Sequence, residues 1–153
     1  MTTPAGAWPR VWCGGPAEPL GAPGFSVAFE LRTANEANGT TQRWAKVRRR
    51  QDARDTTVEA VSVALVDQAM PPAGPWCVRL TRVSPSRLDD DAVPLALKTV
   101  RDAICAILGV DDGSDVVAFA YAQRKGRPMG VAVEVWGAEA LPGVLRLAQD
   151  PDP

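Results

Sequence analysis

Five aspartates form two clusters on either side of one predicted helix. Asp89, Asp90 and Asp91 precede the helix, and Asp111 and Asp112 follow it. Carboxylate oxygens are the preferred ligands of hard divalent cations such as Mg²⁺. In an extended approach to the helix, Asp89 and Asp91 point to one side and Asp90 to the other, because side chains alternate along an extended chain. The pattern therefore predicts two carboxylates directed at one cation.

These aspartates also have a purely structural explanation. Acids before a helix complement its positive amino-terminal end and cap free backbone N–H groups, which accounts for one or two members of the triplet. Acids after a helix face its negative end, where they cost stability unless a turn or a cation compensates them. The stretch DDGSD at 111–115 can also be an ordinary Asp-Gly turn. The second pair is the stronger reason to expect a cation site.

The length of the intervening helix decides how the two clusters can meet. A straight helix of about sixteen residues places its ends roughly 24 Å apart, because each residue adds about 1.5 Å. One chain therefore cannot bring Asp89 and Asp91 next to Asp111 or Asp112. A twofold dimer with two such helices packed antiparallel does bring them together. The sequence predicts an obligate homodimer with two composite sites.

Lys98 lies on the same helix, off its apolar face. A lysine at this place can bind a phosphate group or offset the acidic charge. The ordinary alternative is a surface ion pair with Asp102, four residues further along the helix.

A basic segment at residues 43–54, RWAKVRRRQDAR, carries six positive residues and one negative residue, a local charge of +5. The whole chain has a net charge of −1, so the remainder carries −6 (−1 minus +5). A concentrated positive segment is typical of contacts with nucleic-acid phosphates, and a solvated, charged helix start is the ordinary alternative. The expected phosphate contacts are Arg43, Lys46, Arg48, Arg49, Arg50 and Arg54, with Arg124, Lys125 and Arg127 as a second, weaker group.

Trp44 lies inside the basic segment and has two candidate roles. An exposed indole can stack on an unpaired base. A buried indole anchors its helix to the core, and this is the role that we expect for Trp44.

The residue types that the chain lacks exclude several kinds of chemistry. It has no histidine, which removes His-based catalytic triads and zinc sites with imidazole ligands. Its three cysteines, Cys13, Cys77 and Cys105, lack metal-ligand spacing, and their odd number suits a reducing compartment. Neither a membrane span nor a signal peptide is recognisable, so we expect a cytoplasmic protein with no membrane partner.

Both predicted helices have an apolar face. In the first helix, from about 48 to 70, the face consists of Val58, Val61, Leu65 and Ala69, and Pro71 and Pro72 end the helix. The second helix, from about 93 to 108, has Pro94 in its first turn and Gly109 at its carboxyl end. Its apolar face consists of Val93, Leu97, Val100, Ile104, Ile107 and Leu108.

The remaining periodic segments predict strands, and the 153 residues fit one domain. The strands are expected at 25–32, 76–83, 116–123 and 131–136, and the loop RKGRPMG joins the last two as a hairpin. The order predicts an α/β (α+β) fold, with a mixed sheet of about four strands packed against two helices. We divide the chain into a Pro/Gly-rich irregular arm (1–24), a folded body (25–137) and a tail (138–153).

The run LDDDAVPLALKTVRDAICAILGVDDGSD, followed by YAQRKG and VAVEV, resembles the RusA-like Holliday junction resolvases of phages and prophages. The family pattern is Asp-x-Asp-Asn, a lysine one or two turns later, an Asp-Ala-hydrophobic step, and an Asp-Asp pair after the helix. The matching residues are Asp89, Asp91, Lys98, Asp102, Ala103, Ile104, Asp111 and Asp112. With an Asn-containing loop and the basic segment upstream, the similarity covers roughly Phe25 to Trp136.

The resemblance implies a homodimeric endonuclease that cuts four-way DNA junctions with one or two Mg²⁺ ions per site, Mn²⁺ being an alternative. Asp89, Asp91 and one of Asp111 or Asp112 are then the metal ligands, and Lys98 and Asp112 complete the expected catalytic set. Two residues depart from the family pattern: Ala92 replaces the expected Asn, and Pro94 lies in the helix. Loss of the Asn removes a polar group beside the carboxylates.

Two other functions remain open. One is a dimeric protein of the same fold that binds branched DNA with weakened or lost catalysis, as Ala92 indicates. The other is a small non-enzymatic interaction protein whose acidic loops bind partners or solvent. Metal-dependent cleavage separates the nuclease from both, and salt-sensitive DNA binding separates the two alternatives.

Overall fold

A computed structural model describes residues 11–13, 22–33, 43–72, 76–111 and 116–137. Its strands are β1 (Val11–Cys13), β2 (Phe25–Glu30), β3 (Trp76–Ser84), β4 (Val117–Lys125) and β5 (Gly130–Trp136). Its helices are α1 (Arg43–Ala64), α2 (Val93–Ala96) and α3 (Lys98–Leu108), and a 3₁₀ turn at Asp90–Ala92 precedes α2.

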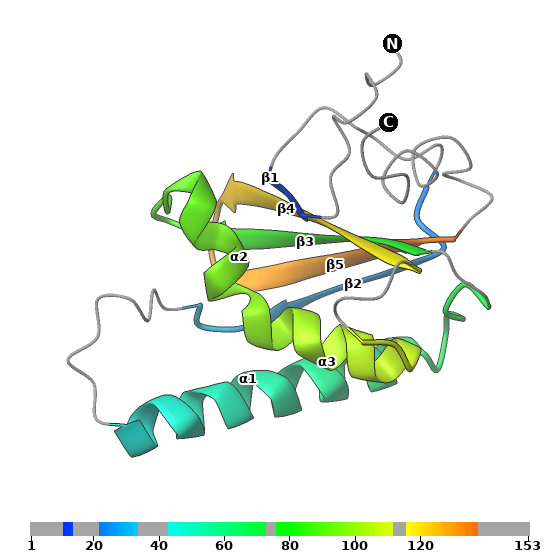
Figure 1. Cartoon of the computed structure of the whole chain (residues 1–153), viewed down its shortest axis with the longest axis horizontal. Coiled ribbons are helices and arrows are strands. Elements are labelled where there is room, and N and C mark those ends of the chain that lie inside the picture. The colour runs from blue at the N-terminus through cyan, green and yellow to red at the C-terminus, as the bar shows by residue number, and fades with distance from the viewer. Residues whose placement is uncertain (1–10, 14–21, 34–42, 73–75, 112–115, 138–153) are drawn as a thin grey trace, which may run out of the picture.

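The strands form one mixed sheet in the order β1-β4-β3-β5-β2. β3 is parallel to β4 and antiparallel to β5, and β5 is also antiparallel to β2. The helices lie on one face of this sheet (Figure 1). The expected mixed α+β fold with four main strands in one small domain is confirmed. The short β1, paired in parallel with β4, lies in the arm that the sequence predicts to be irregular.

The predicted hairpin between the last two strands is wrong. β3 lies between β4 and β5, so these two strands are not neighbours in the sheet. The connecting loop crosses the end of β3, where the N–H of Gly126 donates to the carbonyl of Ser84 at 3.1 Å. Two strand spacings amount to about 10 Å, which a loop of this length can span as easily as a tight turn. The backbones of β5 and β2 lie close together at Gly130, where a Cβ atom would lie 2.3 Å from the carbonyl oxygen of Phe29. This position therefore accommodates glycine only.

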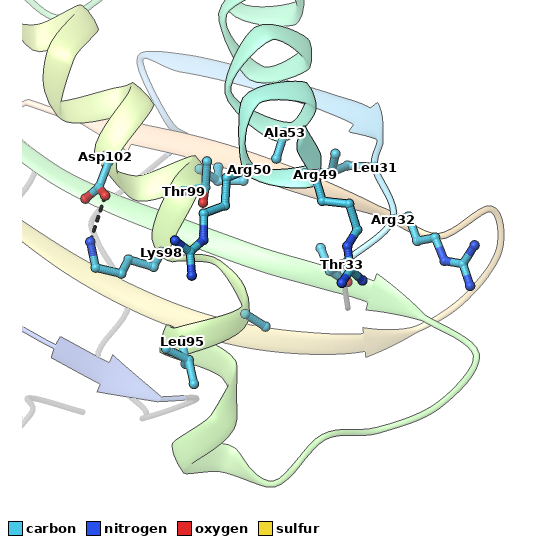
Figure 2. A pocket seen from close by; sticks show the side chains of 12 residues that line it. Leu31, Arg32, Thr33, Arg49, Arg50, Ala53, Leu95, Lys98, Thr99 and Asp102 are labelled. Carbon is cyan, nitrogen blue, oxygen red and sulfur yellow. Dashed lines mark hydrogen bonds and ion pairs between the residues drawn. The ribbon is translucent and has the colours of Figure 1, made fainter. Parts of the chain in front are cut away.

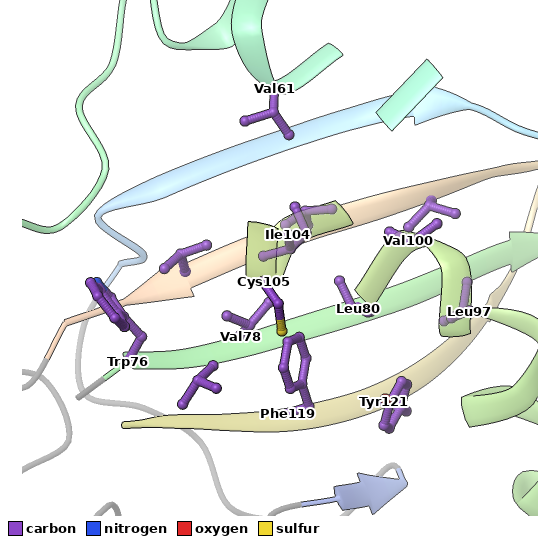
Figure 3. Close-up of a cluster of buried hydrophobic side chains, with 14 of the residues drawn as sticks. Val61, Trp76, Val78, Leu80, Leu97, Val100, Ile104, Cys105, Phe119 and Tyr121 are labelled. Atoms are coloured by element: carbon purple, nitrogen blue, oxygen red, sulfur yellow. The ribbon is translucent and has the colours of Figure 1, made fainter. Parts of the chain in front are cut away.

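The core fills the space between the sheet and the helices (Figure 3). Alternate residues of β3, including Val78 and Leu80, face Val100 and Ile104 of α3 and are fully or almost fully buried. Each such side chain stabilises the fold by about 1.5–3 kcal/mol relative to its exposed state. The core therefore fixes α3 against the sheet, and α1 packs in turn against α3 and β2.

Helix α1 begins and ends earlier than the sequence predicts, at Arg43 and Ala64 rather than about 48 and 70. Of its predicted apolar face only Val61 is buried, whereas Val58 and Leu65 are each 38% exposed. The reason is that α1 lies at the margin of the sheet, so only a narrow strip of the helix reaches the core. Thr57 and Val61 form that strip.

The second predicted helix is divided at Leu97 into α2 and α3, which run in different directions (Figure 1). Leu97 has φ −103° and ψ 9°, outside the helical range, and its side chain is fully buried. Pro94 lies in the first turn of α2, and Gly109 ends α3 with φ 76°, both as the sequence predicts. The left-handed conformation at Gly109 is one that L side chains rarely adopt.

Candidate functional site

The acidic triplet lies on the turn that leads into α2. Asp89 is extended (φ −61°, ψ 146°), but the 3₁₀ turn begins at Asp90, so the expected alternation of Asp89 and Asp91 does not hold. The side chain of Asp89 caps neither the 3₁₀ turn nor α2, since neither start has a side-chain cap. The capping role that the sequence allows for these acids is therefore not observed.

The three carboxylates differ in their contacts. The Asp90 carboxylate pairs with Arg87 at 3.0 Å, whereas the carboxylates of Asp89 and Asp91 have no hydrogen bond or ion pair among the described residues. Both are exposed. In the described ranges, no group of three or more acidic, cysteine or histidine residues lies close enough to hold a metal ion. Among the described residues, no third acidic side chain is therefore placed to share a cation with Asp89 and Asp91.

Asp111 lies far from the acidic triplet. Asp111 is exposed and follows the turn that closes α3, while Asp112 lies outside the described residues. The start of α2 and the end of α3 are at opposite ends of the molecule (Figure 1). Although α2 and α3 are not one straight helix, α3 alone is 11 residues, about 16 Å at 1.5 Å per residue.

Lys98 forms the ion pair that the sequence offers as its ordinary alternative. Its Nζ lies 2.8 Å from Oδ2 of Asp102, with side chains 56% and 37% exposed. An exposed i,i+4 pair of this kind contributes little to stability, about 0.3–0.5 kcal/mol. Asp102 holds the lysine ammonium on the surface of α3 without burying it.

Two residues that the sequence analysis missed anchor the loop at 85–91, called the acidic loop below because it ends in the aspartate triplet. Gln123 of β4 donates from Nε2 to the Leu88 carbonyl at 2.8 Å and accepts from the Leu88 N–H at 2.9 Å. Arg82 of β3 donates to the Ser86 carbonyl at 2.8 Å and to Gln123 Oε1 at 3.4 Å. Together they fix residues 86–88, the segment directly before Asp89.

Arg82 is a buried cation, only 3% exposed. Within the described part of the chain its hydrogen bonds go to neutral oxygens, those above and Oγ1 of Thr33 at 3.0 Å. Burial without a carboxylate partner lowers the pKa of the Arg82 guanidinium, because desolvation disfavours the charged form. Strand alternation is the signal that could have found both anchoring residues. Arg82 lies two positions after Leu80 in β3, and Gln123 lies two positions after Tyr121 in β4, so each shares the inward face of its strand.

A pocket of about 340 Å³ opens where β2 ends and α1 and α3 begin (Figure 2). It brings Arg49 and Arg50 of the basic segment together with Lys98, which lies about fifty positions later in the sequence. Arg32, which sequence reasoning missed, adds a fourth cation, and Asp102 is the one acid among the lining residues that the structure describes. The remaining lining residues are Leu31, Thr33, Ala53, Leu95, Ala96, Thr99 and Val100.

The basic segment does not present all its side chains on one face. Successive residues of an α-helix are about 100° apart, so Arg48, Arg49 and Arg50 point in three directions. Arg49 and Arg50 line the pocket, whereas Arg48 stacks on the Trp44 ring at 4.9 Å from its centroid. Trp44 is 59% exposed, so its expected role as a core anchor is wrong. Its distance from the core follows from the early start of α1, beyond the sheet margin.

Lys125 and its neighbours Arg124 and Arg127 are exposed at the carboxyl end of β4. Because β3 and β4 are parallel, this end lies at the same edge of the sheet as the loop that leads from β3 to Asp89. The hydrogen bond between Gly126 and Ser84 joins the two loops directly. The second basic group is therefore on the acidic-loop edge of the sheet.

No protein-family model matches the chain, and no curated protein matches its sequence. The cysteines at positions 77 and 105 are both buried. None of the helices in the described ranges is both long and apolar enough to cross a bilayer.

Proposed function

We propose that the protein is a Mg²⁺-dependent, structure-selective endodeoxyribonuclease that acts as a homodimer on branched DNA, with the four-way junction as its substrate. The sequence resemblance to RusA-like resolvases motivates the proposal. The observation that carries it is the pocket lined by Arg49 and Arg50 of α1 and by Lys98 of α3, the helix that follows the acidic triplet. Solubility alone does not require these cations to lie together in one pocket.

The carboxylates of one acidic cluster are the ligand type that a hard cation prefers, but two of them are too few to complete its coordination. Asp89 and Asp91 offer exposed oxygen donors, as Mg²⁺ prefers, and Asp90 is already paired with Arg87. A third carboxylate, Asp111 or Asp112 in the proposal, has to come from a second copy of the chain, since α3 separates the two ends. A bound cation supplies a polarised water and neutralises charge on the phosphate.

The chain's own residues have separable tasks in this proposal. Arg49, Arg50 and Arg32 bind phosphate and set the position of the strand to be cut. Lys98 neutralises the charge that develops on the phosphate, once the phosphate competes with Asp102 for its ammonium group. Arg82 and Gln123 hold the loop of Asp89 and Asp91 in place, and Arg43, Lys46, Arg48, Arg54 and Lys125 contact phosphates further away.

A second candidate function is a branched-DNA-binding protein of the same fold without catalysis. The ion pair between Lys98 and Asp102 favours it, because in this pairing the ammonium is already neutralised. Ala92, where an Asn is expected, points the same way. Both candidates share the dimer and the basic pocket.

The deciding experiment incubates the protein with a labelled four-way junction and with a linear duplex of matching sequence, each with Mg²⁺ and with EDTA. Paired, symmetric nicks in the junction that depend on Mg²⁺ are expected. Binding of the junction without nicks leaves the second candidate. If the protein binds neither DNA, both candidates fail and the fold serves a non-enzymatic interaction.

A further inference from the structure

We infer that the pocket between α1, α3 and the end of β2 accepts one unpaired nucleotide, holding its phosphate on the arginines and its base against apolar lining residues. The inference rests on the proposed function, because it names the feature of branched DNA that the protein recognises. It follows from the composition of the pocket.

Four cationic side chains lie across the pocket. Arg49 extends toward Thr33, Arg50 reaches down from α1 toward Leu95, and Arg32 points away from Thr33 at the margin of the pocket (Figure 2). Arginine presents several N–H donors in a fixed plane, which suits the oxygens of a phosphate. Among the described lining residues, four cations against one acid give a formal charge of +3 (4 minus 1). The positive charge of the lining therefore favours a ligand with an anionic group.

The rest of the lining does not suit a phosphate alone. Apolar side chains also line the recess: Leu31, Leu95 and Val100, with the small Ala53 and Ala96. Leu95 is 55% exposed although it is a large apolar side chain. Apolar surface left open beside a charged cluster indicates a ligand that is apolar on one side and anionic on the other.

A nucleotide meets both requirements, and its base must be unpaired to enter a recess of about 340 Å³. A base in a duplex is covered by its neighbours, whereas a base at a branch point has already lost part of its stacking. The pocket thus gives a physical reason for selecting branched over linear DNA without reading sequence.

The test measures binding in EDTA, where no cleavage occurs. The full chain is titrated with thymidine 5′-monophosphate, thymidine and inorganic phosphate, and then with oligothymidylate and a blunt duplex. The monophosphate should bind at least about tenfold more tightly than thymidine or phosphate alone, because both parts of the pocket contribute. Oligothymidylate should compete with the monophosphate, and the duplex should not.

Two variants locate the binding. Arg49→Ala and Leu95→Ser should each weaken monophosphate binding by about tenfold, whereas Val66→Ser, which also removes an exposed apolar side chain, should not. Equal affinities for monophosphate and phosphate, or an unchanged affinity in Leu95→Ser, would show an anion site only and overturn the inference. So would a lack of binding. Loss of the proposed nuclease function has a different signature: monophosphate binding persists while the Mg²⁺ junction assay gives no nicks.

Discussion

Gln123 holds the backbone of Leu88 by two hydrogen bonds, 2.8 Å to its carbonyl and 2.9 Å from its N–H, so a β4 side chain binds Leu88 as a neighbouring strand would. Leu88 directly precedes Asp89. The position of the segment before Asp89 is therefore set by β4 together with Arg82 of β3, through residues that are themselves no candidate ligands or catalytic groups.

This contact predicts a stability cost in Gln123→Leu. The variant leaves both backbone groups of Leu88 without their partner and removes one acceptor of Arg82, so we expect a loss of about 1–3 kcal/mol in the free energy of unfolding. Urea denaturation measures it. Gln51→Leu, at an exposed glutamine of α1, is the control and should change stability by less than about 0.5 kcal/mol. Equal effects of the two substitutions would show that Leu88 is held by other means.

The buried guanidinium of Arg82 predicts a pH-dependent stability in Arg82→Lys. Burial lowers the pKa of the cation at this position, and lysine starts from a lower ordinary value, about 10.4. Between the depressed folded pKa and about 10.4, the unfolded chain binds the proton that the folded chain has released, so stability rises with pH. Compared with wild type, Arg82→Lys should be less stable near pH 7 and regain part of the difference near pH 10. A pH-independent difference in urea unfolding would mean that the lysine ammonium reaches solvent.

The sequence predicts the sheet residues well because strand alternation is a local signal. Val78 and Leu80 face the core as their period requires, and the same is true of Val100 and Ile104 in α3. Strand order is not local: nothing in RKGRPMG distinguishes a hairpin from a loop that crosses β3. The position of α1 at the sheet margin is equally non-local, and it explains both the exposed Trp44 and the poorly buried Val58.

The candidate site was predictable in its residue types but not in its grouping. Asp89, Asp91 and Lys98 are recognisable from spacing, whereas the pocket joins Lys98 to Arg32 and Arg49 through tertiary packing. The break at Leu97 also had no clear signal, since its apolar side chain continues the helical pattern.

The different contacts of the adjacent aspartates predict different effects of removing their charges. Asp91→Asn should lower Mg²⁺-dependent cleavage by at least about a hundredfold, if cleavage depends on its carboxylate as a ligand, while junction binding in EDTA is retained or improved. Asp90→Asn is the matched control, because Asp90 is paired with Arg87 and should lose little activity. Cleavage by Asp91→Asn at the wild-type rate removes Asp91 from the site.

The division of the basic segment predicts that its residues act differently on DNA. Trp44→Ala should weaken binding to a junction with unpaired bases by about 1–3 kcal/mol, through lost stacking, with little change in the salt dependence. Arg54→Ala should reduce the slope of log affinity against log salt concentration by about one, through a lost phosphate contact. Because Trp44 is 59% exposed, Trp44→Ala should also keep its unfolding free energy. A large loss of stability would instead restore Trp44 to a structural role.

The ion pair on α3 predicts that Asp102 restrains Lys98. Asp102→Asn releases the ammonium group from its 2.8 Å contact at a small cost in stability, because the pair is largely exposed. If Lys98 contacts DNA phosphate, Asp102→Asn should strengthen junction binding in EDTA, and Lys98→Met should weaken it. In the Lys98→Met background there is no lysine for Asp102→Asn to release. The gain in junction affinity from Asp102→Asn should therefore be smaller there, equal to the effect of removing one negative charge. The same gain in both backgrounds would show that Asp102 only repels DNA and that Lys98 makes no contact with phosphate.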